Sequence, residues 1–223
     1  KIGADPMRLL YCLQDPAQEL RFGFKAAKEP ASSLNILENI SRLVEKPSNV
    51  KVKRIEDLWI ISKAHSLIKR VTGELENLRP HQATRALQEF WLNDLSRGYI
   101  QLIRDRLSEG DIEVQTVLYE VYVLLLKLLS PITPFITEKI WQSLRKKGII
   151  EEESVHLSEW PKADEKKIDF ILEAAFSKIL SIIEIGLAER DKAKIGLRWP
   201  LAKAKIGLDE KLPKEYKDII CRQ

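Results

Sequence analysis

The sequence predicts an all-α protein, an antiparallel helical bundle with a short β segment at its C-terminal end. Apolar residues recur at steps of three, four and seven over most of the chain, as on the buried face of an amphipathic helix. Only nine of the 223 residues are glycine and ten are proline, so few breaks interrupt the helical segments. Helix start signals precede several segments, and basic residues or glycine follow them.

Two short helices come first. Residues 4–13 are expected to form one, with Asp5 as a local cap. Ser32 or Ser33 can cap the next, which runs to about Glu45. Its apolar face consists of Leu34, Leu37, Ile40 and Val44.

Two long helices are predicted next, from about Arg54 to Leu78 and from about His81 to Leu107, with Pro80 between them. The buried stripe of the first consists of Leu58, Ile61, Ile68, Val71, Leu75 and Leu78. The stripe of the second consists of Leu87, Trp91, Leu95, Gly98 and Leu102, widened by Phe90 and Ile103.

Residues 114–129 are the most apolar segment and predict the central helix of the bundle. A two-proline corner follows at 130–134. In it Thr133 is a suitable N-cap and Pro134 suits the first helical position. The helix that begins there is closed by basic residues and by Gly148.

The C-terminal part of the sequence changes character. Residues 149–166 lack a regular pattern, and a long helix runs from about Lys167 to Lys192. Residues 195–201 and 202–208 have the pattern of two short strands. Two strands this near the end of the sequence cannot complete a sheet, so we expect the chain to be cut from a longer protein.

Composition limits the cellular setting. The formal net charge is +4 and the pI is near 8.9, a weak indication of a polyanionic partner. Cys12 and Cys221 are the only cysteines, which excludes a cysteine-based zinc site and suits a reducing compartment. The sequence contains neither an uncharged apolar run of membrane-spanning length nor a secretory signal. We expect a cytoplasmic protein without a membrane partner.

Catalytic signatures are missing from the sequence. His65, His81 and His156 lie far apart, and no metal-binding histidine spacing occurs. Glycine-rich phosphate loops and the GxSxG elbow are absent as well. Most carboxylates lie beside Lys or Arg at helix-surface spacing. The sequence therefore predicts no catalytic residue, no metal site and no cofactor site in this chain.

Seven segments share their order with one enzyme family. They are GADPMRLL (3–10), LNILEN (34–39), RPHQA (79–83), NDLSRGYI (93–100), SPITPFITEKIW (130–141), SVHLSEWP (154–161) and LRWPL (197–201). Together they resemble the class I aminoacyl-tRNA synthetases for isoleucine, valine, leucine and methionine. Three of them, RPHQA, NDLSRGYI and LRWPL, favour isoleucyl-tRNA synthetases of the archaeal and eukaryotic type. Glu38 and Gly98 stand where that family usually has Trp.

The resemblance implies a domain organisation. Residues 1–30 would be a connector that contacts the tRNA stem and follows the missing catalytic domain. Residues 31–166 would be the anticodon-binding helical bundle. Residues 167–223 would be a long helix and the start of a truncated C-terminal α/β domain.

The resemblance also implies a function, namely binding of the anticodon stem-loop of an isoleucine tRNA. In the parent enzyme, ATP and Mg would serve the missing catalytic domain, which together with the missing editing domain is the other partner of this region. This chain alone should be an inactive part of an isoleucine–tRNA ligase. Two alternatives remain open: the same region of a valyl- or leucyl-tRNA synthetase, and a non-catalytic helical protein-interaction module.

Candidate RNA contacts follow from how bundles bind RNA, with cations on phosphates and amides or aromatic rings on unstacked bases. Asn39 and Arg42 lie on the helix that faces the anticodon loop in the enzymes this chain resembles. Arg79, His81 and Arg85 flank a helix start, where cations oppose the helix dipole and therefore favour a bound anion. Glu74 and Glu76 could instead neutralise them.

Two further cations and four tryptophans complete the predictions. Arg104 and Arg106 alternate with Asp105, which indicates solvated surface or phosphate contacts. Arg104 joins the candidate tRNA-binding residues. Trp141 and Trp160 are expected in the core. Trp59 and Trp199 could be exposed and provide surfaces on which bases stack.

Overall fold

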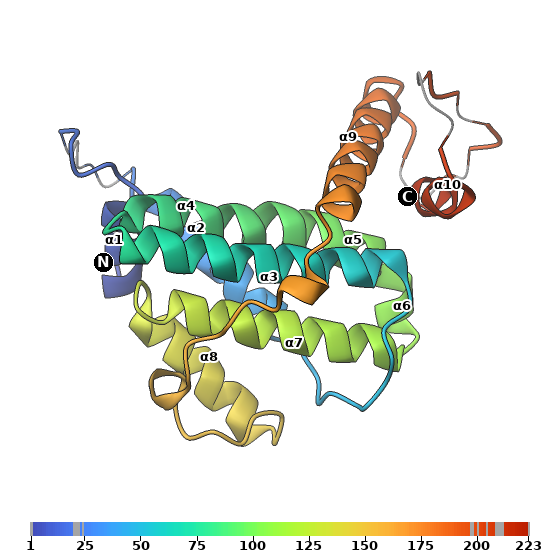
Figure 1. Ribbon diagram of the computed structural model, residues 1–223. Coiled ribbons are helices and arrows are strands. Elements are labelled where there is room, and N and C mark those ends of the chain that lie inside the picture. Colours follow the sequence, from blue (N-terminus) through green and yellow to red (C-terminus); the bar gives the residue numbers. More distant parts are fainter. Residues whose placement is uncertain are drawn as a thin grey trace. The chain divides into compact units, whose positions relative to one another are not determined.

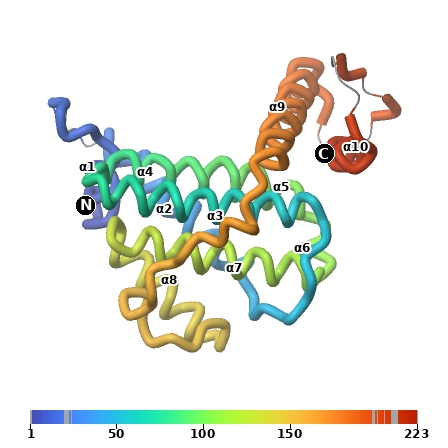
Figure 2. Tube along the Cα trace, viewed as in Figure 1, coloured from blue at the N-terminus to red at the C-terminus, as the bar shows by residue number. Residues whose placement is uncertain are grey.

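The computed structural model describes residues 2–19, 23, 25–196, 199, 201–203, 205–207 and 212–222. The chain forms two compact units that divide between Ile168 and Asp169. Figures 1 and 2 show helices throughout both units, which confirms the all-α prediction.

The predicted β segment at 195–208 lies partly outside the described residues, at positions 197, 198, 200, 204 and 208. The described residues of this segment form no strand.

The first unit contains most of the helices. They are α1 (Ala4–Cys12), α2 (Lys28–Ile40), α3 (Ile55–Glu76), α4 (Pro80–Glu89), the π-helix η1 (Phe90–Tyr99), α5 (Ile100–Leu102), α6 (Arg104–Ser108), α7 (Ile112–Leu129) and α8 (Pro134–Lys146). Two 3₁₀ turns, η2 (Val155–Leu157) and η3 (Glu165–Lys167), lie in the segment predicted to be irregular. None of the described helices is long and apolar enough to span a bilayer.

Consecutive long segments of this unit run in opposite directions. The Tyr122 hydroxyl of α7 donates to the Leu37 carbonyl of α2 at 2.6 Å, and Thr116 lies against Ser48 farther along the chain. The chain therefore runs along α7 in the direction opposite to α2 and the residues that follow it, so the two helices are antiparallel. With the α3–α4 turn, this gives an up-and-down bundle of α2, α3, α4–η1 and α7 (Figure 1).

The bundle has two ends, which we name for their short helices. The α6 end holds α6 and the starts of α3 and α7; there the backbone N–H of Arg54 donates to the Glu113 carboxylate at 3.1 Å. The α1 end holds α1, the α3–α4 turn at residues 77–79 and the start of α8.

The predicted core stripes are largely buried. All four apolar residues predicted on α2 and its C-terminal extension are at most 3% exposed: Leu34, Leu37, Ile40 and Val44. Two predictions on α3 are wrong, because Leu58 is 41% and Leu78 is 86% exposed. Leu78 has a φ of 55°, and the Arg79 N–H donates back to the Glu74 carbonyl at 2.8 Å. This is the left-handed C-terminal motif that ends a helix and turns its residue outward.

The helix predicted from His81 to Leu107 is not one continuous α-helix. Residues 90–99 form the π-helix η1, and the chain breaks again at Ile103 before α6. Trp91, Leu95 and Tyr99 are all fully buried and recur every four residues. Both aromatic rings and the Leu95 side chain thus lie in the core, although their spacing exceeds the 3.6 residues of an α-helical turn.

Two predicted caps are wrong. Ser33 lies inside α2, which begins at Lys28, and its hydroxyl donates to the Glu29 carbonyl at 3.0 Å. Asp5 does not cap α1. Its carboxylate instead accepts the Ile136 N–H at 2.6 Å and so caps α8, where the Thr133 side chain makes no capping bond. Asp5 is 5% exposed, so α1 and α8 meet at a buried carboxylate.

Replacing Asp5 with alanine is expected to lower the free energy of unfolding by about 1–2 kcal/mol, the cost of a lost N-cap. Urea unfolding followed by circular dichroism measures this change. Asp105→Ala is a matched control, because Asp105 is exposed and its side chain makes no ion pair or hydrogen bond in the described residues. An equal effect of the two substitutions would contradict a capping role for Asp5.

The second unit contains α9 (Phe170–Lys192) and α10 (Lys214–Cys221). The Asp169 carboxylate accepts the Leu172 N–H at 2.9 Å and caps α9. Phe176 of α9 and Tyr216 of α10 pack edge to face with ring centroids 6.0 Å apart. The sequence pattern predicted α9 but not α10.

Candidate nucleic-acid interface

The six predicted RNA-binding residues fall into two groups along the bundle. Arg79, His81 and Arg85 lie at the α1 end, where the first turn of α4 meets α1. Arg79 Nε lies 2.8 Å from Glu74 Oε2, and Arg85 Nε donates to the Leu13 carbonyl at 3.0 Å. His81 is half-buried. The two arginines of this group are thus engaged within the protein.

The other group lies toward the α6 end. Asn39 is in the last turn of α2, Arg42 follows that helix, and Arg104 begins α6. All three are exposed. Within the described residues, the Arg42 and Arg104 guanidinium groups form neither an ion pair nor a hydrogen bond, so both are available to an external anion.

Arg106 does not lie on the surface as predicted. It is 6% exposed and sits at the centre of a buried network at the α6 end. Its guanidinium donates to both Asp57 oxygens at 3.0 and 2.8 Å, to Glu56 at 3.1 Å and to Asp111 at 2.9 Å. The Tyr99 hydroxyl donates to the same Asp57 carboxylate at 2.7 Å.

The charges of this network are compensated by hydrogen bonds and helix dipoles. Glu56 and Asp57 lie in the first turn of α3, and Asp111 accepts the first N–H groups of α7. The positive ends of both helices therefore face these carboxylates. Burial raises the pKa of Asp57 against the opposing effect of Arg106, and burial with the nearby Asp57 charge raises the pKa of Tyr99 well above its usual value. Although burial opposes it, Asp57 and Asp111 hold the pKa of Arg106 above its ordinary value.

A basic loop connects α2 and α3, and Arg42 is the one residue of it that the sequence predicted to bind RNA. We call residues 41–54 the strap (Figures 1 and 2). Its cations are all exposed: Arg42, Lys46, Lys51, Lys53 and Arg54. The strap contains one carboxylate, that of Glu45, so its formal net charge equals the +4 of the whole chain. A count of charge along the sequence would have found it.

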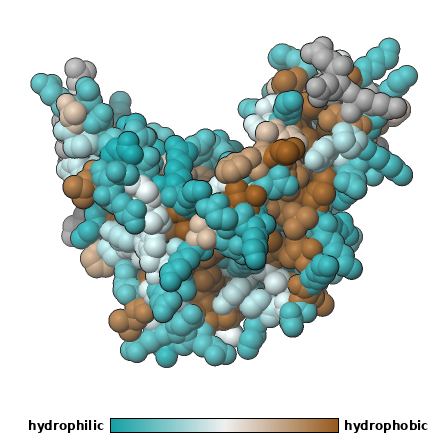
Figure 3. All heavy atoms as spheres, in the orientation of Figure 1, coloured by the Kyte–Doolittle hydropathy of each residue, from teal (hydrophilic) through white to brown (hydrophobic). Residues whose placement is uncertain are grey.

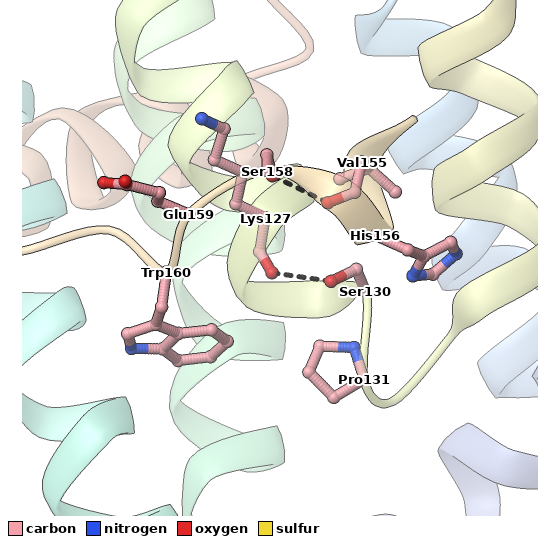
Figure 4. Close-up of a pocket in the computed structure, with 8 residues that line it drawn as sticks. All are labelled: Lys127, Ser130, Pro131, Val155, His156, Ser158, Glu159 and Trp160. Atoms are coloured by element: carbon pink, nitrogen blue, oxygen red, sulfur yellow. Dashed lines mark hydrogen bonds between the residues drawn. The ribbon is translucent and has the colours of Figure 1, made fainter. Parts of the chain in front are cut away.

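A hollow of about 330 Å³ lies beside the proline corner (Figure 4). It is lined by Lys127, Ser130, Pro131, Val155, His156, Ser158, Glu159 and Trp160. Ser130 donates to the Lys127 carbonyl at 2.9 Å, and Ser158 donates to the Val155 carbonyl at 2.6 Å. Both hydroxyl groups donate their protons to backbone carbonyls. We therefore interpret the hollow as the gap between α7 and the segment at residues 155–160 that crosses it.

The rest of the described surface contains no further cluster of candidate ligand-binding or catalytic side chains. No group of three or more His, Cys, Asp or Glu side chains among the described residues is placed to hold a metal ion. Cys12 and Cys221 are free. Hydrophilic residues cover most of the face shown in Figure 3, and apolar residues gather along α9, where Phe170, Ile171 and Ile185 are exposed.

An antiparallel bundle with unpaired cations gathered near one end has the form of a helical nucleic-acid-binding domain. Residues 57–206 match the family described as the anticodon-binding domain of tRNA ligase, and the chain belongs to that family. This confirms the class of protein that the sequence motifs indicated.

Curated relatives include several archaeal isoleucine–tRNA ligases. The chain is 39% identical to that of Pyrococcus horikoshii over 96% of its own length, and 37% identical to that of Methanosarcina acetivorans over 91%. It is 32% identical to that of Methanopyrus kandleri over its full length. The chain spans only about a fifth of these relatives, 21–22% of each.

A solved structure shares the fold. It is the ternary complex of the Agrobacterium radiobacter K84 LeuRS with tRNA and LeuAMS, which matches 75% of this chain with a TM-score of 0.57. The match covers 20% of that LeuRS chain, at 20% sequence identity.

Proposed function

We propose that this chain is the tRNA-recognition region of an isoleucine–tRNA ligase and binds the anticodon stem-loop of an isoleucine tRNA. The observation that carries the proposal is the identity of 32–40% with archaeal isoleucine–tRNA ligases over nearly the whole chain. The unpaired cations of the bundle support it, because phosphate contacts supply much of the affinity of RNA-binding proteins.

The parent protein would attach isoleucine to tRNA at the expense of ATP, in the cytoplasm. Its catalytic domain would hold ATP and Mg, and this chain would supply neither ligands nor catalytic groups for them. We assign residues 1–30 to a connector, residues 31–166 to the anticodon-binding bundle and residues 167–223 to a C-terminal α/β domain. The relatives favour isoleucine over the valine or leucine alternative.

The contacts made by each candidate suggest different roles in this proposal. Asn39, Arg42 and Arg104 have exposed side chains near one end of the bundle and suit RNA contacts. Arg79 and Arg85 already contact Glu74 and the Leu13 carbonyl, so binding RNA through them would first break these contacts. We therefore assign Asn39, Arg42 and Arg104 to RNA contacts, and Arg85 to holding α1 against α4.

The test is a titration of the 223-residue chain with an isoleucine tRNA transcript and with the same tRNA carrying an altered anticodon. Tighter binding to the native anticodon, weakened by added salt, is expected from base recognition combined with phosphate contacts. Equal binding to both would restrict the proposal to phosphate contacts. Absence of binding, together with capture of a protein partner at high salt, would favour a protein-interaction module.

Arg42→Ala is expected to weaken tRNA binding by about 1 kcal/mol or more, roughly fivefold, as the loss of one phosphate contact does. Lys146→Ala is the matched control: it removes one exposed cation from the end of α8, far along the chain from the strap. Fluorescence anisotropy at fixed salt measures both. If the two variants lose the same affinity, Arg42 has no special role.

A further inference from the structure

We propose that the strap, residues 41–54, is a phosphate-binding site that holds the tRNA backbone without reading its sequence. This inference rests on the proposed function, and it adds four cations to the single strap residue, Arg42, among the candidates above. They are Lys46, Lys51, Lys53 and Arg54, all of them exposed.

Charge is distributed unevenly along the chain. The strap carries five cations and one carboxylate, whereas the chain as a whole carries 37 cations and 33 carboxylates. Outside the strap, positive and negative charges are therefore equal in number. The field that attracts a polyanion to this protein is concentrated in a segment of 14 residues.

The charges of the strap cations are not balanced by ion pairs within the described part of the protein. Several surface cations outside the strap do have partners: Lys63 lies 3.2 Å from Asp94, and Lys139 lies 2.6 Å from Glu38. No strap cation has a carboxylate within 4.0 Å in the described residues. The Glu113 carboxylate accepts, through Oε1, the backbone N–H groups of Lys53 and Arg54 at 2.6 and 3.1 Å.

The strap is preorganised by its contacts with the bundle. Thr116 of α7 bonds both the N–H and the carbonyl of Ser48 at 3.1 Å, and Glu113 fixes the strap where it enters α3. Val44 is 1% exposed and anchors the other end in the core. A loop held at its start, middle and end loses less conformational entropy on binding than a free loop of the same length.

The chemistry of the strap suits a phosphate backbone better than a protein partner. Lysine ammonium groups act as point charges toward phosphate, without the fixed geometry that base recognition needs. Polar and aliphatic residues make up the rest of the strap, which has no aromatic ring on which a base could stack. The structure therefore assigns it to sequence-independent contacts.

The experiment compares two triple variants of the 223-residue chain with the same change of charge. The strap variant is Lys46→Gln, Lys51→Gln and Lys53→Gln. The control variant is Arg145→Gln, Lys146→Gln and Lys147→Gln, at the end of α8. Glutamine keeps the backbone N–H of residue 53 that Glu113 accepts, and equal melting curves establish that both variants fold.

Each protein is titrated with the native and the altered-anticodon isoleucine tRNA over a range of salt concentrations. We expect the strap variant to bind both RNAs about 10- to 100-fold more weakly at low salt, and the slope of log K against log salt to fall by about 2–3. The control variant should stay within about threefold of the unchanged protein and should keep its slope.

Four results would overturn the inference. Equal losses in the two variants would mean that net charge alone matters. A loss confined to the native anticodon would mean that the strap reads bases. If the unchanged chain binds neither RNA, the proposed function fails along with the inference, whereas unchanged binding by the strap variant removes the inference alone.

Discussion

Arg106→Ala is expected to destabilise the first unit by about 3–5 kcal/mol, the usual cost of removing one partner from a buried ion pair. The reason is the carboxylates left behind. Asp57 is fully buried and Glu56 is 4% exposed, and both would lose their hydrogen-bonded cation. Urea unfolding measures the change as a lower midpoint with an unaltered slope.

Arg104→Ala supplies the matched control, since Arg104 lies two residues away, is exposed and has no ion pair in the described residues. A surface change of this kind is expected to stay within about 0.5 kcal/mol. Arg106→Lys should fall between the two, because an ammonium keeps the charge but cannot form the paired bonds to Asp57. If Arg106→Ala and Arg104→Ala have equal effects, the network contributes nothing to stability.

The pH dependence provides an independent check on the same variant. Burial already raises the pKa of Asp57, and removal of Arg106 should raise it further. A carboxyl group whose folded pKa lies above its unfolded value destabilises the fold at high pH, and this penalty fades as the pH falls. The deficit of Arg106→Ala relative to the unchanged protein should therefore shrink as the pH falls from 7 toward the ordinary carboxyl pKa of 3.8.

Local pattern predicted the helices of this protein because helices are stabilised by contacts between residues three and four apart. The burial of Leu34, Leu37, Ile40 and Val44 follows directly from their spacing. The same reasoning placed Trp141 in the core, where it is fully buried. It failed for Trp59, which is 1% exposed rather than a stacking platform, whereas Leu58 beside it is 41% exposed.

Contacts distant in sequence could not be predicted in this way. Arg106 meets Asp57 across 49 residues, and Asp5 caps α8 across 131 residues. In the sequence alone, Arg106 has Asp105 beside it and has the pattern of a solvated surface residue. Nothing local distinguishes it from Arg104, which is exposed. Arg106 is buried and Arg104 is exposed because of the position of α3 in the fold.

The candidate RNA surface was predictable in part. Arg42 and Asn39 followed from the resemblance of their helix to the family, and their exposure is compatible with that role. The strap lies outside the segments that resemble the family, so the resemblance did not predict it. Its charge is visible in the sequence, but the bonds from Thr116 and Glu113 that hold it in place required the fold.

Trp141→Ala is the second substitution with a large expected effect, about 3–5 kcal/mol, as for other large-to-small changes in a core. Trp141 lies on α8 with its ring fully buried, and its indole N–H donates to the Glu152 carbonyl at 3.0 Å. The Lys127 ammonium lies 5.8 Å from the ring centroid. The substitution removes the contacts of α8 with α7 and with the segment that follows α8.

Trp199→Ala is the control with identical chemistry, because Trp199 is 72% exposed, and it should change the unfolding free energy by less than about 0.5 kcal/mol. For a domain of this size, the Trp141 variant should melt roughly 10 °C lower. A fall of that size in a single transition would mean that α8 unfolds together with the bundle. A small early transition with the main one unchanged would mean that α8 opens by itself, and the Asp5 cap would then hold a locally unstable helix against α1.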